Sequence, residues 1–210
     1  MHSIKDIEKK ANHVLLSYFK SKGRAVEMPI DPIDILESKG FSIDYVNDKY
    51  DKNIYGALQL EEKTVEVNAD ISFNKGMENF TIAHEIGHIE LHAPLLNDKD
   101  TSCNPMLDHD DDQIEKEADT FAACLLMPER NVKDIFYKIR RSPLVLRDNF
   151  LFRFLGKGNK RKRALNFASV IIKEGQFNVS KYAMINRLIT LRLLRGIGYQ
   201  NNKYNYQRRS

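Results

Sequence analysis

The sequence centres on the stretch Phe80-Thr81-Ile82-Ala83-His84-Glu85-Ile86-Gly87-His88-Ile89-Glu90-Leu91-His92, which contains the pattern His-Glu-x-x-His. On a helix, His84 and His88 lie on one face about one turn (~5–6 Å) apart, so both imidazoles can reach a single Zn²⁺. Glu85 between them can act on a water molecule that the metal activates. The spacing therefore predicts half of a zinc site, which needs a third ligand from elsewhere in the chain.

Periodicity and turn residues predict a mixed α+β fold around this motif. Two helices are expected before it, over residues 4–22 and 31–40, followed by strands over residues 41–46, 54–60 and 64–68. The last two strands are joined by Glu61-Glu62-Lys63 as a hairpin, so we expect a small, mainly antiparallel sheet of three strands beside the metal helix. That helix should begin near Lys75 and run to about His92, because Pro94 follows.

A second helix is expected over Gln113–Met127, with Asp111 or Asp112 as its N-cap and Pro128 at its end. Its small residues, Ala118 and Ala122, would allow close packing against the helix with the two histidines.

The third metal ligand has several candidates, namely Glu115, Glu117, Asp119, His92, His109 and Cys103. Glu115 is favoured because it lies early in the Ala-containing helix. Asp119 lies one turn further on, where it can accept the free ring N–H of a ligating histidine. Glu117 points roughly 200° away from Glu115 around the helix.

The two motifs together resemble the ImmA/IrrE family of metallo-endopeptidases. The first is Phe80–His88, and the second is Glu115-Lys116-Glu117-Ala118-Asp119-Thr120-Phe121-Ala122-Ala123-Cys124-Leu125-Leu126-Met127-Pro128. The resemblance covers roughly residues 30–128 and also follows the thermolysin-type order of ligands. It implies zincin-like helices, Zn²⁺ held by His84, His88 and Glu115, and Glu85 as general base. This chain has Asp119 where the family usually has Asn.

Other residues near the site are candidates for further roles. Tyr55, His92 and His109 are candidates for stabilising the oxyanion of the reaction. His92 is better explained as a residue at the helix end, or one supporting a ligand, than as a fourth ligand. Cys103 is expected to be a plain loop residue, and Cys124 is expected in the core.

Composition excludes several classes of protein. The chain has 210 residues, of which 42% are hydrophobic and 30% charged, as in ordinary globular proteins. No apolar run approaches the ~18 residues of a membrane span, and the first residues are charged, unlike a signal peptide. Two cysteines cannot build a disulfide framework, so we expect thiols and a cytoplasmic protein.

The charge is distributed unevenly. Residues 1–128 contain 13 Lys and Arg against 25 Asp and Glu, a net −12, whereas residues 129–210 contain 20 against 4, a net +16. A basic segment of this kind indicates an anionic partner such as DNA, or docking against the acidic segment.

The basic segment is expected to be helical. Ile135-Phe136, Leu144–Leu146 and Phe150–Phe152 should be buried on helices, and residues 156–163 should form a basic loop. Helices are expected over residues 164–174 and 180–194, with Ser180 as an N-cap. Phe177–Leu188 is similar to the helix-turn-helix-like tail of many ImmA/IrrE proteins. Candidate contacts to nucleic acid or a protein partner are Lys160, Arg161, Lys162, Arg163, Lys181 and Arg187.

These observations predict a zinc metallopeptidase domain over residues 1–128, in which residues 1–29 are an N-terminal helical segment, and a basic helical region over residues 129–210. The resemblance implies a specific protein substrate, typically a helix-turn-helix repressor of a mobile element, phage or stress regulon. The alternative is a regulatory module that binds DNA or protein and has a non-catalytic zinc site. The sequence leaves the oligomeric state open.

Overall fold

The computed structural model describes residues 1–47, 55–96, 110–147 and 159–200. They divide into two compact units, Met1–Leu126 and Met127–Ser210, which are considered separately. No helix in the described part of the chain combines the length and the apolar character needed to cross a membrane.

The first unit begins with two helices, each with a side chain that caps its N-terminus. Helix α1 (Ile4–Ser21) starts after Ser3, whose side chain accepts from the backbone N–H of Asp6. Helix α2 (Pro32–Ser38) starts after Asp31, which caps the N–H of Ile33. Helix α1 buries a stripe of apolar residues, Ile7, Ala11, Val14, Leu15 and Phe19, and it packs against α4 (Asp110–Leu126). Both N-terminal helices were predicted.

The sheet of this unit has three strands in the order β1-β3-β2. Strands β2 (Gly56–Gln59) and β3 (Thr64–Asn68) form the predicted antiparallel hairpin, and Lys63 in its turn has a positive φ of 50°. Strand β1 (Ser42–Val46) pairs in parallel with β3 on its other side. The short 3₁₀ helix η1 (Ala69–Ile71) then connects β3 to the metal helix.

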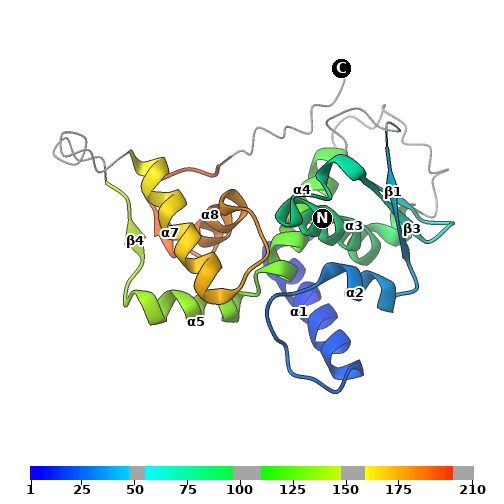
Figure 1. Ribbon diagram of the computed structural model, residues 1–210, viewed down its shortest axis with the longest axis horizontal. Coiled ribbons are helices and arrows are strands. Elements are labelled where there is room, and N and C mark those ends of the chain that lie inside the picture. Colours follow the sequence, from blue (N-terminus) through cyan, green and yellow to red (C-terminus); the bar gives the residue numbers. More distant parts are fainter. Residues whose placement is uncertain (48–54, 97–109, 148–158, 201–210) are drawn as a thin grey trace. The chain divides into compact units, whose positions relative to one another are not determined.

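Helix α3 (Lys75–Leu96) carries His-Glu-x-x-His and lies between the sheet and α4 (Figure 1). It continues past Pro94, where the sequence predicted its end. A proline in the last turn removes only one backbone donor, so the helix can continue for two further residues. Helix α4 begins at Asp110, and Asp111 and Asp112 therefore lie inside its first turn rather than capping it.

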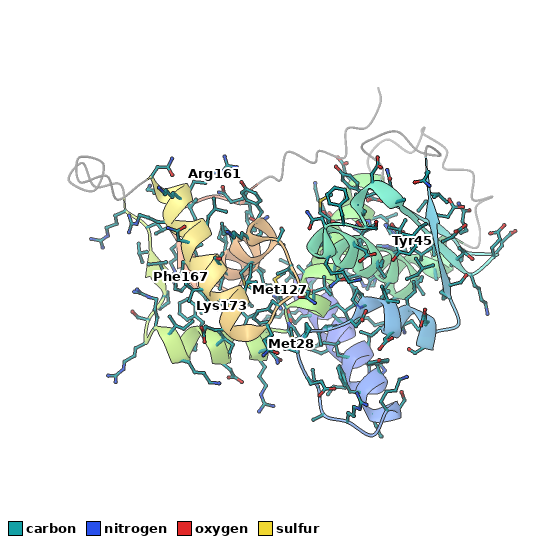
Figure 2. The ribbon with its side chains drawn as sticks, in the orientation of Figure 1. Met28, Tyr45, Met127, Arg161, Phe167 and Lys173 are labelled. Atoms are coloured by element: carbon teal, nitrogen blue, oxygen red, sulfur yellow. The ribbon has the colours of Figure 1, made fainter. Side chains whose placement is uncertain are left out.

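The second unit contains α5 (Glu129–Ile139), α7 (Lys160–Gly175) and α8 (Lys181–Thr190). Helix α7 packs against both α5 and α8, and Phe167, labelled in Figure 2, makes an edge-to-face contact with Phe136 of α5. Ser180 caps α8 by accepting from the N–H of Ala183, as predicted.

Three expectations for this unit were wrong. Leu144–Val145 forms strand β4, which pairs in parallel with β5 (Leu194–Arg195), rather than a helix. Residues 160–163 form the first turn of α7 rather than a loop, because Asn159 caps the N–H of Lys162. Helix α8 ends at Thr190 rather than at residue 194, because Leu194 belongs to strand β5 of the two-stranded sheet. Residues 150–152 lie outside the described residues.

Candidate metal centre

The two histidines of the motif converge from successive turns of α3. The Nε2 atoms of His84 and His88 are 2.9 Å apart. Glu115 on α4 joins them, with Oε2 3.2 Å from His84 Nε2 and Oε1 3.4 Å from His88 Nε2. The structure thus brings together the three residues that the sequence favoured as metal ligands.

The close approach of α3 and α4 depends on two small residues. A Cβ atom at Gly87 would lie 3.0 Å from the Cα of Ala118 and 3.2 Å from the Cβ of Phe121. Contacts this short are rare for real Cβ atoms, so an added side chain would require Ala118 or Phe121 to shift by a few tenths of an ångström. Gly87 therefore allows Glu115 to reach the histidines.

The three donors match the size of a metal ion. A tetrahedral ion with bonds of about 2.0–2.2 Å separates its ligand atoms by about 3.3–3.6 Å. The observed separations of 2.9, 3.2 and 3.4 Å are close to this spacing. Small side-chain movements would therefore accommodate an ion on His84, His88 and Glu115.

Asp119 supports this arrangement from the next turn of α4. Its Oδ1 lies 2.9 Å from Nδ1 of His84. A carboxylate only accepts, so Nδ1 of His84 carries a hydrogen and Nε2 faces Glu115 and His88. Although burial opposes the charged form of His84, hydrogen bonds to Asp119 and Glu115 raise its pKa to about 10. The site therefore has the negative character that attracts a cation.

The pKa of Glu115 is shifted in the opposite direction. Burial opposes its charged form, but hydrogen bonds from His84 and His88 outweigh burial and hold the pKa of this carboxyl well below its usual range. Glu115 is therefore ionised at neutral pH, which is the form that binds a metal.

Glu85 lies on the same helix but faces β2. Its side chain is buried, and a Cβ atom at Gly56 would lie 3.3 Å from Glu85 Oε1 and only 2.5 Å from Thr81 Cγ2. Burial raises the pKa of Glu85, while His84 and His88 act against that rise. A buried carboxyl beside two imidazoles is suited to accepting and returning a proton.

His92 has a different environment from the one expected of an oxyanion donor. It is 1% exposed, its Nδ1 lies 3.3 Å from Nδ1 of His88, and its Nε2 lies 3.3 Å from Oε2 of Glu117. Both ring nitrogens thus face protein groups, as in a residue that supports a ligand, and a role of His92 in stabilising an oxyanion stays a prediction. Burial lowers the pKa of His92, so its ring is neutral at physiological pH.

The sequence also singled out Tyr55, His109, Cys103 and Cys124. Tyr55 directly precedes β2, and its carbonyl accepts from the N–H of Asn68; its catalytic role stays a prediction. His109 and Cys103 lie outside the described residues. Cys124 is fully buried, as expected, and its thiol donates to Glu8 at 3.0 Å.

The basic residues of the second unit separate into exposed and buried ones. Arg161, in the first turn of α7, is exposed and donates to the hydroxyl of Tyr182 at 3.0 Å (Figure 2). Lys162 and Lys181 are also exposed, whereas Lys160 and Arg163 are half-buried. Arg187 is only 2% exposed, and its Nε donates to the carbonyl of Met127 at 2.9 Å. The side chain therefore stabilises the unit internally, and its candidate role in binding a partner stays a prediction.

Sequence reasoning missed two residues of the centre. Gly56 borders Glu85 through a strand pairing that no local pattern reveals. Glu117 was set aside because it points away from Glu115, yet it is buried against His92. The spacing of four residues from His88 to His92 was the available signal, because it places a third imidazole on the same helix face, one turn further on.

A His-Glu-x-x-His helix crossed by a second helix that brings a carboxylate to both imidazoles is the arrangement of helix-based metallohydrolase sites. The particular family follows from comparison with known proteins. Residues 41–150 match the peptidase family M78, described as the IrrE N-terminal-like domain, and the chain belongs to this family. The resemblance to ImmA/IrrE proteins is thereby confirmed.

One curated relative is the Metallopeptidase ImmA of Bacillus subtilis (strain 168). The two sequences are 32% identical over 79 residues, a segment that covers 38% of this chain and 45% of the relative. The similarity therefore spans less than half of that protein.

Proposed function

We propose that this protein is a zinc-dependent endopeptidase. The observation that carries the proposal is the convergence of His84, His88 and Glu115 within ligand distance of one another, with Glu85 adjacent on α3. Family membership and the name of the Bacillus relative support a metallopeptidase.

Zn²⁺ is the metal that suits these donors best, because two imidazoles and one carboxylate form a common ligand set of hydrolytic zinc sites. Three protein ligands also leave a position for water or substrate. When bound, the ion lowers the pKa of water and polarises a scissile carbonyl.

Glu85 would perform the proton transfers. Its carboxylate takes a proton from the attacking water and later delivers that proton to the leaving amine. The buried position beside Gly56 holds the carboxyl next to β2. His84 and His88 hold their ring orientation through contacts of their outer nitrogens.

The substrate we propose is a specific protein, a helix-turn-helix transcriptional repressor of a mobile element, phage or stress regulon. This part rests on the resemblance to ImmA/IrrE proteins. We also propose a cytoplasmic location, in which Cys124 remains the thiol that donates to Glu8.

The test uses the purified full-length chain and the product of the neighbouring gene, with and without a metal chelator. We expect a single cut that chelator abolishes and that Zn²⁺ restores. Glu85→Gln should retain zinc and the fold while losing cleavage by about 10²–10⁴-fold. Full activity of this variant would contradict the mechanism.

The alternative is a regulatory module that binds DNA or a protein partner and uses zinc without catalysis. The exposed cations Arg161, Lys162 and Lys181 on α7 and α8 favour an anionic partner. An intact candidate substrate together with tight, metal-independent DNA binding would favour this alternative. Cleavage that depends on Glu85 would exclude it.

A further inference from the structure

Glu117 is a buried carboxylate that the proposed mechanism does not use. Its side chain is only 4% exposed. Oε1 accepts from the backbone N–H of His2 and from Nε2 of Gln113, each at 2.9 Å. Oε2 lies 3.3 Å from Nε2 of His92. One oxygen therefore anchors the segment before α1, and the other faces α3.

The contact with Glu117 determines which nitrogen of His92 carries the proton. An ionised carboxylate can only accept, so Nε2 of His92 is the donor. In a neutral imidazole the other nitrogen, Nδ1, is then an acceptor. That atom lies 3.3 Å from Nδ1 of His88.

The same reasoning extends to His88. Because Nδ1 of His92 accepts, Nδ1 of His88 must donate, which leaves the lone pair of His88 on Nε2. That nitrogen is the one 3.4 Å from Glu115 and 2.9 Å from His84 Nε2. The direction of the two hydrogen bonds thus presents the correct atom of His88 to a metal.

We propose that Glu117 and His92 form a two-bond relay that fixes the tautomer and ring orientation of His88 for metal binding. This inference rests on the proposed metal site. Each metal histidine is then held by a carboxylate of α4, His84 directly by Asp119 and His88 through His92 by Glu117. Glu117 and His92 are positioning residues, since both act through His88.

An isosteric substitution can reverse this relay. In Glu117→Gln the amide oxygen is required at the position of Oε1, because the N–H of His2 can only donate. The amide NH₂ then faces Nε2 of His92 and makes that nitrogen an acceptor. His92 would donate from Nδ1, so His88 would have to carry its proton on Nε2, where it blocks metal binding.

The experiment measures metal affinity of the full-length chain by titrating Zn²⁺ against a chromophoric chelator. We expect Glu117→Gln to weaken zinc binding by about 10–100-fold, the usual effect of losing a group that supports a metal ligand. Co²⁺ should give a d–d absorption spectrum in the variant that differs from that of the wild type, because His88 is displaced. The matched control is Glu90→Gln on α3, which removes the charge of a carboxylate paired with Lys39 and Lys10 and should leave zinc affinity unchanged.

A second variant keeps the proposal falsifiable if Glu117→Gln fails to fold. His92→Leu removes the acceptor of His88 and should also weaken zinc binding by about 10-fold or more. In a double-mutant cycle, Glu117→Gln should have no further effect once His92 is leucine. Additive effects, or wild-type zinc affinity in both folded single variants, would overturn the relay.

The outcomes separate this inference from the proposed function. A wild-type chain that binds neither Zn²⁺ nor Co²⁺ would refute the metal site itself. A wild-type chain that binds zinc, with variants that lose thermal stability but keep wild-type affinity, would refute the relay alone and leave Glu117 a structural residue.

Discussion

Asp119 on α4 accepts a hydrogen bond from Nδ1 of His84 on α3 at 2.9 Å. This contact orients the ring of one candidate metal ligand from the helix that also supplies Glu115. Related ImmA/IrrE sequences usually have Asn at this position, and an amide oxygen can accept the same bond.

Asp119→Asn should therefore keep zinc affinity close to that of the wild type, whereas Asp119→Leu should lower it by about 10–100-fold. The acceptor is kept in the first variant and removed in the second. Chelator competition measures both. Equal affinity in all three proteins would show that Asp119 does not support His84.

The carboxylates of α4 differ in their expected effect on metal content. Glu115→Ala removes a ligand and should lower zinc affinity by more than ~100-fold, whereas Glu117→Ala should have the smaller effect of a supporting residue. Atomic absorption after dialysis gives the metal content of each variant. The reverse order would show that Glu117, rather than Glu115, is the third ligand.

Gly87 should be sensitive to any added side chain. Gly87→Val places atoms against Ala118, where even a Cβ would be 3.0 Å from Cα, and overpacking of this kind costs about 1–3 kcal/mol. We expect a lower free energy of unfolding in denaturant and weaker zinc binding, because α3 and α4 are forced apart. Ile89→Val on the same helix controls for the low helix propensity of valine. An equal loss of unfolding free energy in both variants would contradict the explanation by overpacking.

The pairing of Tyr45 with Glu78 predicts a pH-dependent loss of stability. Burial, and then the hydrogen bond from the Tyr45 hydroxyl to Glu78 at 2.6 Å, raise the pKa of Tyr45 to about 12. Because the folded pKa is above the unfolded value of about 10, the stabilisation is complete below pH 10 and is lost as pH rises towards 12.

Tyr45→Phe removes this contribution at every pH. Since Tyr45 is partly exposed (Figure 2), we expect a loss of only about 1 kcal/mol at pH 7. The difference in unfolding free energy between wild type and variant should shrink between pH 10 and 12. A constant difference across that range would show that the hydroxyl does not titrate as described.

Sequence periodicity was sufficient where local signals are strong. Ser180 marks the start of α8, as predicted, because its side chain satisfies a backbone N–H group close to it in the chain. Periodicity was insufficient where the pairing partners are distant in the sequence. The parallel pairing of β1 with β3 and the pairing of β4 with β5 join segments that no local pattern relates.

In the candidate metal centre, too, some residues follow from local sequence and others only from the tertiary structure. The sequence by itself determined the His84–His88 pair, because a helical repeat of 3.6 residues places positions i and i+4 on one face, and it selected Glu115 from the second motif. Only the tertiary structure decided that Gly87 meets Ala118, that Gly56 borders Glu85, and that Glu117 faces His92. These contacts depend on the crossing of α3 with α4 and with the sheet, and such crossings are set by packing between elements distant in the chain.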